Sequence, residues 1–230
     1  MIEAIFFDYN GVVIDDERLQ MQAYQEIFRG QEIELTEEQY LSALGMDDRS
    51  FVRSVFKRQE AQLTDERLGT VLAAKSERRR NLIQDELPLC PGVVTFLKAT
   101  SRQFALGLVS MAGWEEIHYV LERARLEDLF QVIVSAGNVG RCKPAPDCYL
   151  YGLEKLNERR RANRLLPLLP RDCLVIEDSP PGIQAGKEAG MRTLGVTNTV
   201  SEKALRDAGA KVVTPSLADW TVEAVELVFS

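Results

Sequence analysis

Histidine is nearly absent from this chain, whose 230 residues include only His118. The four cysteines, Cys90, Cys142, Cys148 and Cys173, form no C-x-x-C pair. Structural and catalytic zinc sites use clusters of these two residue types at short spacings, so a zinc site is not expected here. We expect the cysteines to be reduced thiols.

Long apolar runs and excess positive charge are also lacking. No segment approaches the roughly 20 consecutive apolar residues of a membrane-spanning helix, and the chain begins without the basic and apolar regions of a secretory signal. The formal net charge of −7 argues against non-specific nucleic-acid binding and against a polybasic membrane anchor. We therefore expect a cytoplasmic monomer whose partner is a small molecule, not a nucleic acid or a membrane.

The beginning of the chain carries a distinctive pattern. Residues 4–13 are Ala-Ile-Phe-Phe-Asp-Tyr-Asn-Gly-Val-Val. The apolar residues up to Phe7 indicate a strand that is buried on both faces, as in a parallel sheet. Asp8 follows directly, and Gly11 allows a tight turn. Open α/β sheets bind ligands beyond the carboxyl ends of their strands, so Asp8 is either a turn cap or a functional carboxylate.

Residues 16–86 contain helical patterns and no strand pattern. Helix starts are predicted at Asp15-Asp16-Glu17 and at the capping box Thr36-Glu37-Glu38-Gln39, and further helices over 50–60 and 65–85. We interpret this block as an inserted helical domain, with 1–15 and 87–230 forming the core. On its last helix, Arg78-Arg79-Arg80 occupy consecutive positions that spread around the helix, so we expect a solvated surface there.

From Pro91 onward, strand and helix patterns alternate, which predicts a doubly wound parallel sheet. Strands are expected over 104–109, 131–134, 173–176, 194–196 and 211–213. Ser110 ends the first of these, Lys143 lies in the loop after the second, and Glu177-Asp178 end the third. The predicted fold class is α/β: a Rossmann-like core with an inserted four-helix cap.

The residues at these strand ends have a consistent chemistry. Asp8, Glu177 and Asp178 would repel one another unless a hard divalent cation, for which Mg²⁺ is the best candidate, lies between them. Lys143 and Ser110 are suited to holding phosphoryl oxygens. An ionised Asp beside a metal can act as a nucleophile and form an aspartyl-phosphate. The alternative is an ion-pair network between Lys143 and the acids.

Four segments in order resemble the haloacid dehalogenase-like (HAD) superfamily, within it the β-phosphoglucomutase/phosphatase-like group. The segments are Phe6-Phe7-Asp8-Tyr9-Asn10-Gly11-Val12, Leu108-Val109-Ser110, Lys143-Pro144-Ala145-Pro146-Asp147, and the run from Ile176-Glu177-Asp178-Ser179-Pro180 to Gly190. The resemblance covers nearly the whole chain, because the helical block at 16–86 is similar to the cap of that family.

The resemblance implies a role for each matching residue. Asp8 would be the nucleophile and a Mg²⁺ ligand, with the backbone carbonyl of Asn10, Asp178 and, directly or through water, Glu177 completing the metal site. Catalysis would involve Asp8, Asn10, Ser110 and Lys143. Substrate contacts would come from Gly11, Ser110, Met111, Ala112 and Lys143. Gln20, which stands where similar sugar-phosphate mutases have a His, and Arg49, in a segment that does not cleanly match their substrate loop, are further candidate contacts.

Asn10 departs from the family pattern, in which a second Asp protonates the leaving group and later activates water. An amide cannot exchange a proton in this way, so we expect a slowed Mg²⁺-dependent hydrolase of a small phosphorylated metabolite. Two alternatives remain open. One is cleavage of a C–P bond, as in phosphonoacetaldehyde hydrolase, with Lys57 or Lys75 forming a Schiff base. The other is a catalytically weak phosphate-binding or regulatory protein.

Overall fold

The computed structural model describes residues 1–229. Six parallel strands form one sheet in the order β3-β2-β1-β4-β5-β6. Their bounds are β1 Ala4–Phe7, β2 Ala105–Val109, β3 Val132–Val134, β4 Cys173–Glu177, β5 Arg192–Val196 and β6 Val212–Thr214. The Rossmann-like α/β fold predicted from the alternation of strands and helices is therefore confirmed.

Ten α-helices are described. Their bounds are α1 Glu17–Arg29, α2 Glu37–Leu41, α3 Asp48–Arg58, α4 Asp65–Leu82, α5 Val93–Thr100, α6 Trp114–Ala124, α7 Asp147–Ala162, α8 Pro180–Glu188, α9 Glu202–Asp207 and α10 Val222–Val228. Three short 3-10 helices cover Glu127–Leu129, Ala136–Asn138 and Pro170–Asp172.

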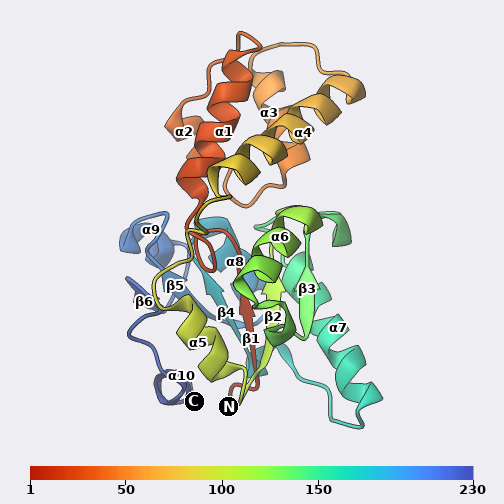
Figure 1. The fold of residues 1–230 in the computed structure, drawn as a ribbon. Helices are drawn as coiled ribbons and strands as arrows, with labels where there is room; N and C mark the ends of the chain where they lie inside the picture. Colours follow the sequence, from red (N-terminus) through yellow and green to blue (C-terminus); the bar gives the residue numbers. More distant parts are fainter. Residues whose placement is uncertain (230) are drawn as a thin grey trace.

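The central strand β1 is buried on both faces because helices cover both sides of the sheet (Figure 1). Successive side chains of a strand point to opposite faces. Accordingly, Ile5 and Phe7 belong to one apolar cluster, which includes residues of α5, α6 and α10. Ala4 and Phe6 belong to a second cluster, which includes residues of α7 and α8. This packing fixes β1 and thereby the position of the residue that follows it.

Helices α1 to α4 lie together beyond one end of the sheet (Figure 1). They have their own apolar cluster, in which the rings of Tyr24 and Phe51 are 4.6 Å apart. The chain enters and leaves this helical layer side by side, because Ile14 and Leu89 form an antiparallel bridge. The amide of Asp15 donates to the carbonyl of Pro88 at 2.7 Å. The domain division at 16–86 stays a prediction.

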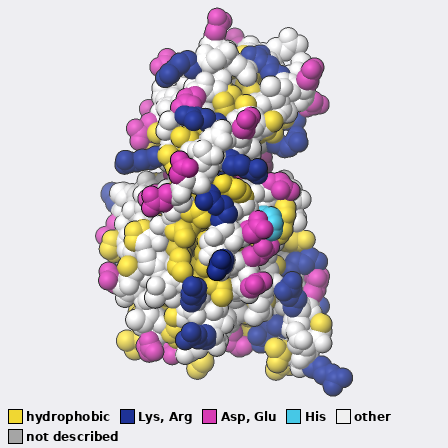
Figure 2. All heavy atoms as spheres, in the orientation of Figure 1, with side chains coloured by type: hydrophobic (Ala, Val, Ile, Leu, Met, Phe, Trp, Pro, Cys, Tyr) yellow, Lys and Arg dark blue, Asp and Glu magenta, His cyan; other side chains and the backbone are white. Residues whose placement is uncertain are grey.

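On the face of the molecule that Figure 2 shows, acidic and basic side chains are interspersed over both the helical layer and the sheet portion. In the described part of the chain, no helix is both long and apolar enough to cross a bilayer.

Candidate active site

Three strands deliver polar side chains to one edge of the sheet. Asp8 follows β1, Ser110 follows β2, and Asp178 follows β4. Parallel strands end at the same edge, so these residues meet there. They line a cavity of about 90 Å³ together with Asn10 and Lys143, and the helical layer closes it with Glu17, Gln20, Tyr24, Tyr40 and Lys75. The cavity thus lies between the sheet and the inserted helices.

Three buried carboxylates lie close together at this edge of the sheet, and two of them, Asp8 and Asp178, line the cavity. Ligand oxygens of Asp8, Glu177 and Asp178 all lie within 4.8 Å of one another. Lys143 donates to Asp8 at 2.8 Å and to Glu177 at 2.6 Å. Burial and the neighbouring carboxylate of Glu177 raise the pKa of Asp8 to about 7, although Lys143 lowers it. Burial and the same neighbour raise the pKa of Asp178 well above its ordinary value.

The donor set fits a hard divalent cation. All three groups offer oxygen, which is the ligand type that Mg²⁺ prefers, and one lysine cannot neutralise three carboxylates. Gly11 makes room for them: its φ is +72°, and a Cβ there would lie 1.8 Å from Oδ2 of Asp178. A larger residue at position 11 would therefore displace a carboxylate of the cluster.

Ser110 is buried and lines the same cavity. Its Oγ accepts a hydrogen bond from the amide of Ala112 at 3.0 Å, and Met111 and Ala112 line the cavity beside it. The turn after β2 therefore presents a hydroxyl and adjacent backbone toward the space in front of Asp8.

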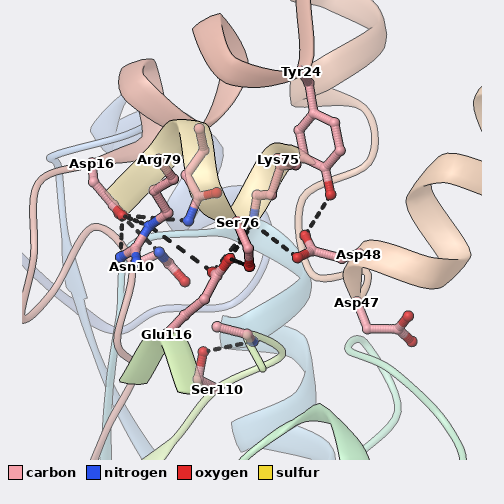
Figure 3. A network of polar contacts seen from close by, with 12 residues as sticks. Asn10, Asp16, Tyr24, Asp47, Asp48, Lys75, Ser76, Arg79, Ser110 and Glu116 are labelled. Atoms are coloured by element: carbon pink, nitrogen blue, oxygen red, sulfur yellow. Dashed lines mark hydrogen bonds and ion pairs between the residues drawn. The ribbon is translucent and has the colours of Figure 1, made fainter. Parts of the chain in front are cut away.

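Asn10 is held by the linker into α1. Its Nδ2 donates to Oδ1 of Asp16 at 2.8 Å (Figure 3). Asp16 is fully buried and also accepts from Nε of Arg79 at 2.7 Å. The amide of Asn10 thus acts as a donor to a carboxylate that is already paired with an arginine.

The expectation that Arg78-Arg79-Arg80 forms a solvated surface is wrong for Arg79. Its side chain is only 2% exposed, because α4 packs on α1 with this residue facing inward, whereas Arg78 is partly exposed. Arg79 donates to Asp16 (Figure 3). It also donates to the hydroxyl of Tyr9 at 3.0 Å. Burial acts to lower the pKa of Arg79, but Asp16 raises it overall. Through its bond to Tyr9, this cation joins the helical layer to the core.

Lys75 forms a second connection of the same kind. Its Nζ contacts Asp48 at 2.8 Å and Glu116 of α6 at 3.0 Å (Figure 3). Burial acts to lower the pKa of Lys75, but the two carboxylates raise it overall. Burial acts to raise the pKa of Glu116, but Lys75 and Arg79 bring it to about 2. Both partners are therefore held in their charged forms.

Glu17 is a cavity residue that the sequence reasoning missed. The hydroxyl of Tyr40 donates to its Oε2 at 2.6 Å. Burial raises the pKa of Glu17 to about 7. Glu17 belongs to the run Asp15-Asp16-Glu17 at a helix start. Acidic residues are favourable there because of the helix dipole, so the run gives no sign of a role in the cavity. The sequence did indicate its position in one way: Glu17 lies nine residues after Asp8, at the start of the helix that follows the Asp8 loop.

The remaining predicted contact residues lie in different places. Gln20 is on the cavity wall, and its Nε2 donates to Asp16 at 3.3 Å. Gly11 lies against the side chain of Asp178 and is not among the residues that line the cavity. Its carbonyl accepts from Asn198 at 2.7 Å. Arg49 is exposed in the first turn of α3 and is not among the residues that line the cavity. The structure therefore brings Gln20, but not Arg49, to the site.

A doubly wound parallel sheet with acids and a lysine at its carboxyl edge, covered by inserted helices, defines a class of α/β enzymes. The haloacid dehalogenase-like hydrolase family matches residues 2–190. A phosphorylated carbohydrates phosphatase from Thermotoga maritima is 30% identical over 212 residues, which cover 91% of this chain and 92% of that protein. The chain belongs to the haloacid dehalogenase-like hydrolase family and is a phosphatase-type enzyme.

Two further comparisons agree. The β-phosphoglucomutase of Bacillus subtilis is 26% identical over 227 residues, which cover 96% of this chain and 93% of that protein. The crystal structure of a β-phosphoglucomutase from Clostridium difficile superimposes with a TM-score of 0.85 at 23% identity, covering 100% of this chain and 97% of that one. The latter similarity shows that the fold is shared.

Proposed function

We propose that this enzyme is a Mg²⁺-dependent phosphatase of a small phosphorylated sugar, with Asp8 as the nucleophile. The observation that carries the proposal is the cluster of three buried carboxylates, Asp8, Glu177 and Asp178, whose oxygens lie within 4.8 Å of one another. Asp8, Asp178 and the carbonyl of Asn10 would hold the cation, with Glu177 bound directly or through water. When bound, Mg²⁺ supplies charge neutralisation for the phosphoryl oxygens.

The residues of the chain provide the other functions of the site. The carboxylate of Asp8 attacks phosphorus, the bond to the leaving oxygen breaks, and an aspartyl-phosphate forms on Asp8. Lys143 lies 2.8 Å from Asp8 and can hold a phosphoryl oxygen beside it. The hydroxyl of Ser110 and the backbone at Met111 and Ala112 can donate to the remaining oxygens.

The walls of the cavity support a hydroxylated substrate. Gln20 is 6% exposed, and its Oε1 is the buried side-chain atom without a hydrogen-bond partner in the described part of the chain. A buried amide oxygen of this kind is satisfied by a hydroxyl donor, such as that of a sugar. The name of the Thermotoga maritima relative refers to phosphorylated carbohydrates. We also propose that residues 16–86 form the cap that selects the substrate.

Cleavage of a C–P bond has less support. A Schiff base requires a neutral amine, whereas Lys75 is paired with both Asp48 and Glu116. Lys57 is exposed and does not line the cavity. A pure binding role leaves the nucleophile, the lysine and the acid cluster without a purpose.

Calorimetric titration with Mg²⁺ and phosphatase assays with and without Mg²⁺ test the proposal. We expect one Mg²⁺ site, which Asp178→Asn abolishes, and turnover that Asp8→Asn abolishes. Asp128→Asn, which changes an exposed acid on the same chain, is the matched control and should alter neither. Undiminished Mg²⁺ binding by Asp178→Asn would remove the metal assignment, and undiminished turnover by Asp8→Asn would remove the nucleophile.

A further inference from the structure

The proposed phosphatase cycle requires a proton donor and a base that Asn10 cannot supply. The departing alkoxide must be protonated, and the water that hydrolyses the aspartyl-phosphate must be deprotonated. An amide neither gives nor takes a proton near neutral pH. Besides Asp8 and Asp178, the carboxyl groups on the cavity wall are Glu17, Asp48 and Glu116.

Two of these three carboxyl groups, Asp48 and Glu116, are already paired with a buried lysine. Asp48 accepts from Lys75 at 2.8 Å and from the hydroxyl of Tyr24 at 2.6 Å. Glu116 accepts from Lys75 at 3.0 Å and from Ser76 at 2.9 Å. A carboxylate that is fixed by a buried cation is a poor proton donor, because its charged form is the stabilised one. Asp16, which Arg79 holds, does not line the cavity.

Glu17 is different from the other two. Its one hydrogen bond within the described residues is from the neutral hydroxyl of Tyr40 at 2.6 Å, and it pairs with no lysine or arginine there. It begins α1, directly after the loop that carries Asn10 and Asp16. Its carboxyl group therefore faces the same cavity as the nucleophile without being neutralised by a cation.

We propose that Glu17 is the general acid and base of this enzyme and performs the proton transfers for which Asn10 is unsuited. The proposal rests on the phosphatase function proposed above. In the first step, Asp8 bonds to phosphorus, the P–O bond to the sugar breaks, and the sugar oxygen takes the proton of Glu17. In the second, Glu17 takes a proton from water, the water oxygen bonds to phosphorus, and the bond to Asp8 breaks. Phosphate leaves, and both carboxyl groups return to their starting states.

The surroundings of Glu17 are suited to both directions of transfer. Burial is the main influence that raises its pKa to about 7, and the charges of Asp16 and Asp8 add to it. The hydrogen bond from Tyr40 and the charge of Lys75 act in the opposite direction. Asp178 also faces this group, since the charge of Glu17 contributes to the raised pKa of Asp178. A general acid that also acts as a base works best with a pKa near the working pH.

The test compares two esters in the full-length enzyme with Mg²⁺: 4-nitrophenyl phosphate, whose leaving group needs no proton, and glucose 6-phosphate, whose alkoxide does. The measured quantity is kcat/KM, which reports only the steps up to transfer onto Asp8. Glu17→Gln should reduce kcat/KM for the sugar ester by about 10²-fold or more, and that for the aryl ester by much less. Glu38→Gln, which changes an exposed acid on α2, is the matched control.

A pH profile provides the second readout and does not depend on the folding of Glu17→Gln. For the sugar ester, kcat/KM should fall as the pH rises through about 7, because Glu17 must carry its proton. The Tyr40 hydrogen bond lowers the pKa of Glu17, so Tyr40→Phe should move this fall to higher pH. A group that only binds substrate would give the same pH dependence for both esters, whereas a proton donor gives this fall for the sugar ester and not for the aryl ester.

The outcomes separate the two proposals. If the unaltered enzyme hydrolyses neither ester, nor any other phosphate ester, the phosphatase function fails and the role of Glu17 fails with it. If it hydrolyses both, and Glu17→Gln reduces both equally through a higher KM, only the role of Glu17 is overturned. A profile that Tyr40→Phe leaves in place also contradicts it.

Discussion

The residue type at position 10 is explained by its buried neighbours, Asp16 and Arg79. Asn10 donates its amide hydrogen to Asp16, which is fully buried beside Arg79. A second carboxylate at position 10 would face Asp16 at hydrogen-bond distance. Two carboxylates in one site raise the pKa of at least one of them. An asparagine at position 10 therefore avoids repulsion by Asp16. The proton transfers, as proposed above, are then carried out by Glu17.

Asn10→Asp should therefore destabilise the protein in a pH-dependent way. The new carboxyl would have a raised pKa in the folded state, so the stability of the variant is fully present below about pH 3.9, the unfolded value, and is lost as the pH rises through the folded pKa. A shift of one unit corresponds to about 1.4 kcal/mol. Urea unfolding at pH 5 and pH 8 measures this loss.

Asn10→Ala is the control for that experiment. It removes the same hydrogen bond without adding a charge, so its destabilisation should be similar at both pH values. If Asn10→Asp also loses the same amount of stability at pH 5 and pH 8, repulsion by Asp16 is not the reason for the asparagine.

Which site residues the sequence reveals depends on how local their signal is. Asp8, Ser110 and Asp178 each end a strand, and strand ends can be found from the apolar pattern alone. Arg79 and Lys75 give no such signal, because their partners lie 63 and 41 residues away along the chain. Only the packing of α4 on α1 and toward α6 decides which arginine of the run at 78–80 is buried. The local pattern around Glu17 gives no sign that it belongs to the cavity, because an acid at a helix start is already expected from the helix dipole.

Among the helices and strands, local chemistry explains the agreements and the small differences. The capping box at Thr36 is confirmed, with Thr36 and Gln39 bonded to each other's amides. Helix α8 begins at Pro180, since Ser179 is its N-cap and proline is favourable at the first helical position. The helix that this capping box begins ends at Leu41, and residues 42–45 form turns that include Gly45, whose φ is +86°.

The pair of Arg79 with Asp16 is one of the buried ion pairs that hold helix α4. Removing one partner of a buried pair leaves an uncompensated charge, which costs about 3–5 kcal/mol. Arg79→Met should lower the free energy of unfolding by this amount. Arg78→Met is the control on the same helix: its pair with Glu26 is more than one-third exposed on both sides, so the loss should be at most about 1 kcal/mol. Denaturant unfolding of both variants measures the difference.

A double-mutant cycle decides whether Asp16 is the cause. Asp16→Asn removes the charge that Arg79→Met would leave unpaired, so the double variant should be more stable than the sum of the two single losses predicts. Strict additivity would show that the loss in Arg79→Met comes from packing, without a contribution from the buried carboxylate.

The chain as a whole is arranged so that the helical layer can be treated as an insertion. The two connecting segments run side by side: the carbonyl of Val13 accepts from Cys90 at 3.0 Å, and that of Pro88 accepts from Asp15 at 2.7 Å. A short Gly-Ser turn can therefore replace residues 16–86 without separating these ends. The deletion removes Lys75 and Ser76, which bind the carboxylate of Glu116, so the core version should also carry Glu116→Gln to avoid a carboxylate without partners.

The core version should fold and still bind Mg²⁺, because the strand ends that carry Asp8, Asn10 and Asp178 remain. It lacks Glu17 and Gln20, so it should hydrolyse 4-nitrophenyl phosphate while its kcat/KM for sugar phosphates falls by about 10²-fold or more. Circular dichroism checks the fold, and the ratio of the two kcat/KM values measures the selection. Full-length Glu116→Gln is the control, because it measures how much of any change in the ratio comes from that substitution alone. A folded core with an unchanged ratio would mean that residues 16–86 neither select the substrate nor supply the proton, and that both roles belong to the sheet edge.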